Sequence, residues 1–259
     1  MSQRMLFVTL LLFAELTLAV TAGLFGGIPA RLGMAAAFLL PLLLLLRAPA
    51  GTPPIALRPS PTARPALLLL PHFILLTAAV SALSAFLFNL LGLPHTGATP
   101  MPTPWAAVLF DAAIPAVCEE MFFRGAIFAA LRPMGRRAAI LGSALLFALM
   151  HANPAQLAYA LVAGVMLGLL YELTGSLLYP VLFHFANNLV SLLFHFVGHT
   201  ALLIGALAVA AAVCTLLLLP TLRKATRPAR ETAPWGFLRE FFLSPLLLWL
   251  AVILILTVL

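Results

Sequence analysis

The sequence predicts an all-α fold, a polytopic membrane bundle of about eight or nine transmembrane helices. Two features of its composition predict this class. Of the 259 residues, 64% are hydrophobic and the mean hydropathy is +1.15. Only 8% are charged, against roughly 25% in soluble globular proteins, so an aqueous surface could not be covered. We therefore expect one integral-membrane domain over residues 1–259, with no separate soluble domain.

Nine apolar runs are candidates for the spans, because a helix needs roughly 17–25 such residues to cross the hydrocarbon. The second and sixth runs are short enough to be re-entrant or enclosed by protein. The first resembles a signal peptide, but it exceeds the usual apolar region of about 7–15 residues, which favours its retention. The runs are 5–25, 32–46, 66–92, 104–131, 138–153, 156–171, 177–197, 200–219 and 241–259.

The basic residues give these spans an orientation. Twelve of the fourteen lie at the N-terminus or in alternate connections, near 47–65, 132–137, 172–176 and 220–240. The opposite connections hold only Arg31, which is the positive-inside pattern. We therefore expect a multi-pass protein of the bacterial inner membrane with a cytoplasmic N-terminus. Topology thus explains the net charge of +7, and we expect no nucleic-acid partner.

Three of the runs contain polar residues that lipid disfavours. A charged side chain at the centre of a span costs about 2.5–3.5 kcal/mol, so such residues are functional candidates. Glu120 and Arg124 are four residues apart on one helix face, and we expect them to form a structural ion pair. Glu119 is turned about 100° away and is left free. The other candidates are His151 in the fifth run and His184 and Asn188 in the seventh.

The depth of these residues tests whether they can meet. At about 1.5 Å per residue, Glu119 lies about 18 Å from the cytoplasmic end of its span at Leu131. The corresponding depths are about 20 Å for His151, 11 Å for His184 and 17 Å for Asn188. His184 and Asn188 also project together from one helix face. We therefore expect a single polar layer.

The helix-breaking residues lie next to this layer. Pro115 should interrupt the backbone ladder ahead of Glu119, and Asn153-Pro154 should end a helix just after His151. Water could enter at such interruptions. A carboxylate beside a histidine can then take a proton from water, while donors on the opposite wall hold an oxyanion. This constellation is typical of a peptidase that has no serine or cysteine nucleophile.

Three motifs in order carry a family resemblance: Glu-Glu-x-x-x-Arg, then Phe-x-x-x-His, then His-x-x-x-Asn. They resemble the CAAX prenyl protease and bacteriocin-processing family of intramembrane endopeptidases, over about residues 104–197. The resemblance implies an all-helical fold around a hydrophilic cavity, with these helices as the catalytic core. It also implies that Glu119 and His151 activate water, that His184 and Asn188 stabilise the oxyanion, and that a membrane-associated peptide or protein tail is cleaved.

Two alternatives remain open. Zinc held by Glu119, His151 and His184 would make a metalloprotease, since two histidines and one carboxylate are a known catalytic set. We expect no metal or other cofactor, because Asn188 suits an oxyanion better than zinc and no His-Glu-x-x-His motif is present. A non-catalytic immunity or scaffold protein could use the same fold. A transporter is disfavoured because no internal repeat is visible.

The remaining polar residues in the runs receive simpler interpretations. His195 and His199 have the spacing of two metal ligands, but their place at the end of a span favours an interfacial position. Asp111 could line a path for water, and Glu172 is expected in a loop. Cys118 lies in an apolar stretch and is expected to pack as a small hydrophobe.

Overall fold

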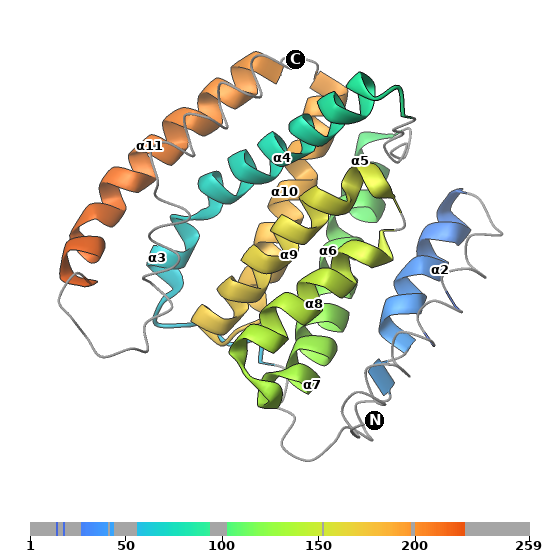
Figure 1. The fold of residues 1–259 in the computed structure, drawn as a ribbon, viewed down its shortest axis with the longest axis horizontal. Helices are drawn as coiled ribbons and strands as arrows, with labels where there is room; N and C mark the ends of the chain where they lie inside the picture. Colours follow the sequence, from blue (N-terminus) through green and yellow to red (C-terminus); the bar gives the residue numbers. More distant parts are fainter. Residues whose placement is uncertain are drawn as a thin grey trace.

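The computed structural model describes residues 27–40, 42–43, 56–93, 103–151, 153–197 and 200–225, together with positions 14 and 18. Every regular element in these ranges is helical, which confirms the all-α prediction for this part of the chain. The helices pack as a bundle, with α2 (Gly27–Leu39) at one edge and α11 (Thr200–Ala225) at the other (Figure 1). The predicted spans 5–25 and 241–259 lie outside the described residues, apart from those two positions.

Within the described part of the chain, four helices are long and apolar enough to cross a membrane, so the expected count of eight or nine is not confirmed. Their spans are Arg64–Leu90, Pro154–Thr174, Leu178–Val197 and Ala201–Leu219. The first joins α3 (Ala63–Leu67) to α4 (Leu70–Leu90), and the next two are α9 and α10.

Two other helices in predicted spans are too short, as described, to cross the hydrocarbon of a membrane. Helix α2 has 13 residues and α8 (Arg136–Met150) has 15. At about 1.5 Å per residue they are about 20 and 23 Å long, less than the roughly 30 Å of hydrocarbon.

The predicted span 104–131 is helical throughout, but two of its segments have a wider winding than an α-helix. These segments, η2 and η3, are π-helices, which are rare and frequently occur at functional sites. Pro115 lies in the first turn of the α-helical segment between them, so the interruption expected ahead of Glu119 is present. The segments are α5 (Pro104–Ala107), η2 (Val108–Ala113), α6 (Ile114–Glu120), η3 (Met121–Phe128) and α7 (Ala129–Leu131).

The connections expected on the cytoplasmic side meet at one end of the bundle. Arg132 forms a two-pronged ion pair with Glu172, with N···O distances of 2.7 and 2.8 Å. The Ser60 amide donates to the Tyr179 hydroxyl at 2.9 Å. These contacts bring together the segments near residues 60, 132 and 172–179. The interpretation of Glu172 as a loop residue is wrong, because it lies in the last turn of α9 (Pro154–Thr174).

The connections expected on the outer side lie at the opposite end. Ser84, near the end of α4, donates to the Ala155 carbonyl at the start of α9 (2.6 Å). Arg31 in α2 forms an ion pair with Asp111 in η2 (2.6 Å). The described chain therefore separates the two sets of connections as the charge pattern predicts. Which end faces the cytoplasm stays a prediction.

Helix α8 ends where the sequence predicts. Its last residue is Met150, and His151 follows as the C-cap. Asn153 then begins α9, since its side-chain oxygen accepts a hydrogen bond from the Ala155 amide at 3.0 Å. His151 is therefore held at a helix end rather than within a regular turn.

Close packing of α8 against α9 forms the centre of the bundle. A Cβ atom added to Gly164 would lie 2.9 Å from the Ala144 Cα atom, so only glycine fits at this crossing. Around it lies a cluster of buried aromatic rings that includes Phe122, Phe123 and Phe147. These rings fix the helices α6, α8 and α10 (Leu178–Val197) that carry the candidate site.

Candidate active site

The expected ion pair between Glu120 and Arg124 is present and fully buried. The Arg124 Nη1 atom lies 2.7 Å from Glu120 Oε1, and both side chains are 0% exposed. Arg124 Nη2 donates to the Gly164 carbonyl at 3.0 Å. The guanidinium also lies over the Phe147 ring, 4.7 Å from its centroid. These contacts partly offset the cost of burying two charges.

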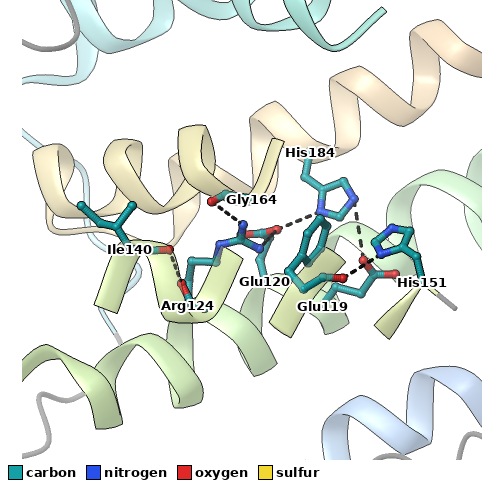
Figure 2. A network of polar contacts seen from close by, with 9 residues as sticks. Glu119, Glu120, Arg124, Ile140, His151, Gly164 and His184 are labelled. Atoms are coloured by element: carbon teal, nitrogen blue, oxygen red, sulfur yellow. Dashed lines mark hydrogen bonds and ion pairs between the residues drawn. The ribbon is translucent and has the colours of Figure 1, made fainter. Parts of the chain in front are cut away.

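His184 joins this pair to Glu119 from the opposite helix (Figure 2). Its Nδ1 atom lies 2.9 Å from Glu120 Oε1, the oxygen that Arg124 also holds. An ionised carboxylate only accepts hydrogen bonds, so His184 Nδ1 carries a proton. The other ring nitrogen, Nε2, lies 3.9 Å from Glu119 Oε2. The link between Glu120 and His184 was not predicted, because it connects α6 and α10 across 64 positions.

Glu119 is the more open of the two adjacent carboxylates. Its side chain is 17% exposed, whereas Glu120 is completely buried. Within the described part of the chain it makes no hydrogen bond, and its ionic contact is with His184. Glu119 is therefore free to accept a proton from a molecule that enters the site.

His151 presents one nitrogen to the site. Its Nδ1 atom donates to the Phe147 carbonyl at 2.8 Å, so in the neutral ring Nε2 carries the lone pair. The His151 ring packs edge-on against the Phe147 ring, with centroids 4.8 Å apart. The same Phe147 ring packs against His184 at 5.7 Å. Phe147 thus brings together two of the predicted residues, and Figure 2 draws them in one group with Glu119.

The two adjacent asparagines of α10 differ in their surroundings. Asn188, the predicted residue, is half-buried and makes no hydrogen bond within the described ranges. Asn187 is buried and links two neighbouring helices: Thr77 donates to its Oδ1 atom at 2.6 Å, and its Nδ2 atom donates to the Tyr159 hydroxyl at 3.0 Å. Thr77, Tyr159 and Asn187 were not predicted from the sequence. The signal for them was a threonine and a tyrosine within two apolar runs, and an Asn-Asn pair within a third.

The other candidate residues have different surroundings in the described part of the chain. Asp111 is ion-paired with Arg31, His195 is exposed in the last turn of α10, and Cys118 is buried in the apolar core. His199 lies outside the described residues. Within the described ranges, no three His, Cys, Asp or Glu side chains are arranged so that they could hold a metal ion.

Comparison with known proteins matches one part of the chain to a family. No curated protein and no solved structure matches the chain significantly. A family model does match residues 100–190, the stretch that carries Glu119, His151 and His184. Its description is "Type II CAAX prenyl endopeptidase Rce1-like". Residues 100–190 of this chain therefore match the Rce1-like type II CAAX prenyl endopeptidase family, a family of proteases, and the resemblance predicted from the three motifs is confirmed.

Proposed function

We propose that this protein is an intramembrane endopeptidase that hydrolyses a peptide bond of a membrane-associated peptide or protein tail. The family match supports a peptidase at the level of the family. The observation that carries the proposal is the unequal environment of two adjacent carboxylates. Glu120 is buried and bonded to Arg124 and His184, whereas Glu119 is partly exposed and 3.9 Å from His184.

In the proposed first step, Glu119 and His151 activate a water molecule. Glu119 takes one water proton, and His151 Nε2 accepts the other O–H as a hydrogen bond, because Nδ1 is already bonded to Phe147. The water oxygen forms a bond to the carbonyl carbon, and the carbonyl π electrons move onto oxygen. Collapse of this intermediate breaks the C–N bond, and the proton on Glu119 passes to the leaving nitrogen.

In the same proposal, the wall formed by α10 stabilises the oxyanion. His184 and Asn188 are four residues apart on one face of α10. Asn188 donates through its side-chain amide, and His184 donates through Nε2 when that nitrogen carries a proton. Donors that are already oriented in a site without bulk water stabilise developing charge strongly. Removal of one such donor commonly lowers kcat by about 10²–10³-fold.

The buried Arg124–Glu120 pair has a role in this mechanism as well. Glu120 Oε1 accepts hydrogen bonds from both Arg124 Nη1 and His184 Nδ1. The pair therefore fixes the orientation of the His184 ring and directs Nε2 towards the site.

The substrate class follows from topology and composition. The family description names prenylated CAAX substrates, but the Ala, Leu, Arg and Pro bias of this chain is typical of bacteria, where we expect peptide precursors or the tails of exported proteins instead. Arg132, Arg136 and Arg137 lie at the end of the bundle that we assign to the cytoplasm. They would favour substrates with acidic residues or a free carboxylate near the inner surface.

The test uses purified protein in vesicles with a membrane-anchored candidate peptide. We expect Glu119→Ala and His151→Ala each to abolish cleavage while expression and Tm remain near wild type, because neither side chain is part of the buried ion pair. Glu172→Ala and His195→Ala are the matched controls, since they remove the same side-chain types far from the site. Near-normal turnover by either site variant would remove the proposed base.

A further inference from the structure

The chain of hydrogen bonds through Asn187 ends in a hydroxyl whose proton has no assigned acceptor. Asn187 Nδ2 donates to the Tyr159 oxygen at 3.0 Å, so this oxygen acts as an acceptor in that contact. The described residues offer no acceptor for the O–H of Tyr159 itself. The Tyr159 side chain is half-buried. A molecule that enters beside it can therefore accept this hydrogen bond.

Tyr159, in α9, is hydrogen-bonded to α10, the helix that carries the proposed oxyanion donors. Its partner Asn187 is adjacent to Asn188 and lies three residues, less than one helical turn, after His184. Through Asn187, the Tyr159 hydroxyl is thus connected to the helix segment whose residues would receive the negative charge.

His184 can offer the oxyanion only a proton on Nε2, because its Nδ1 proton is already bonded to a carboxylate. The Nδ1 proton is bonded to Glu120 Oε1 at 2.9 Å. A proton on Nε2, when present, faces Glu119 Oε2 at 3.9 Å. Tyr159 needs no change of protonation to donate at neutral pH, because a phenol has an unperturbed pKa of about 10. Its O–H is also aligned by a buried amide that Thr77 holds from the other side.

From these contacts we infer that the Tyr159 hydroxyl is a further oxyanion donor, which gives its hydrogen bond to the carbonyl oxygen of the scissile peptide. The inference rests on the proposed endopeptidase function. No proton is transferred in this role, since the hydroxyl donates a hydrogen bond as the carbonyl oxygen becomes negative and keeps its proton when the C–N bond breaks. Asn187 and Thr77 are positioning residues, because they act through Tyr159.

The experiment compares Tyr159→Phe with Tyr179→Phe in the cleavage assay. Tyr179 is the matched control, because its buried hydroxyl also accepts one hydrogen bond, from the Ser60 amide at the far end of the bundle. We expect Tyr159→Phe to lower kcat by about 10²-fold with little change in KM, as for the loss of one oxyanion donor. Its inhibition constant for a peptidyl phosphinate, which mimics the charged intermediate, should rise by a similar factor. Tyr179→Phe should leave all three constants unchanged.

Three outcomes would overturn the inference: an unchanged kcat in Tyr159→Phe, a defect confined to KM, or an equal loss of kcat in Tyr179→Phe. A Thr77→Val variant separates donation from simple positioning of α10, since it breaks the same chain but keeps the tyrosine proton. Equal losses of kcat in Thr77→Val and Tyr159→Phe would assign the whole effect to positioning. Cleavage by wild type and its loss in Glu119→Ala test the proposed function separately, so a fully active Tyr159→Phe would refute only the role of Tyr159.

Discussion

Replacing Arg124 by alanine should destabilise the protein more than any single change at the ends of the bundle. The substitution leaves the Glu120 carboxylate fully buried without its cation, and breaking a buried pair in this way costs about 3–5 kcal/mol. It also removes the 3.0 Å bond to the Gly164 carbonyl and the contact with Phe147. Total stabilities are about 5–15 kcal/mol, so the loss is a large fraction of the whole.

The matched control is Arg132→Ala, which breaks an ion pair at the end of the bundle. The Arg132 side chain is 41% exposed, so its pair with Glu172 should contribute about 0.2–1 kcal/mol. By thermal unfolding in detergent we expect a fall in Tm of about 10 °C for Arg124→Ala, and of a few degrees at most for Arg132→Ala. The yield of monodisperse protein should follow the same order. Equal melting temperatures for the two variants would refute the buried pair.

A double variant separates stability from chemistry at the same place. In Glu120→Leu combined with Arg124→Met, both charges are gone and no buried charge is stranded, so most of the lost Tm should return. Activity should not return, because His184 has lost the partner of its Nδ1 atom. An active double variant would show that Glu120 does not orient His184.

Three other predictions concern the metal, the close helix crossing and the position of the cut. Chelators should leave cleavage intact, and stoichiometric zinc that tracks activity in elemental analysis would instead support a metalloprotease. Gly164→Ala should lower Tm, because its new methyl would lie 2.9 Å from Ala144 Cα. The control Gly168→Ala should be tolerated, since its nearest contact would be at 3.5 Å. Equal melting temperatures for the two variants would contradict the tight crossing. Mass spectrometry should place the cut at or near the inner membrane boundary, and a cut at the outer boundary would contradict the topology. The rate of cleavage should rise when helix-breaking residues flank the scissile bond, since a helical substrate must unwind first.

The sequence predicted those features of the fold that depend on nearby residues. The helix end at His151 and the interruption at Pro115 follow from the chemistry of proline, which acts over a few positions. The Glu120–Arg124 contact follows from a spacing of four residues on one helix. The sorting of connections to two ends follows from the positions of the arginines.

Features that depend on how different helices meet could not be predicted. No spacing rule relates His184 to Glu120 or Tyr159 to Asn187, because each contact joins separate helices. The span count is not confirmed for a related reason. Helix α8 is apolar but has only 15 residues, and apolar composition alone does not distinguish a helix enclosed by protein from one that faces lipid. The roles of Glu119, His151, His184 and Asn188 remain predictions.

The two π-helical segments on either side of α6 bear on how this chain could diverge from its relatives. A π-helix accommodates more residues per turn than an α-helix, since its hydrogen bonds run from residue i to i+5. Loss of one residue from η3 could therefore be absorbed by a return to α-helical winding. Side chains beyond the deletion would then keep their directions relative to Glu119, whereas the same deletion in an α-helix would rotate them by about 100°. A one-residue gap within Met121–Phe128 would thus leave the surroundings of the site largely unchanged.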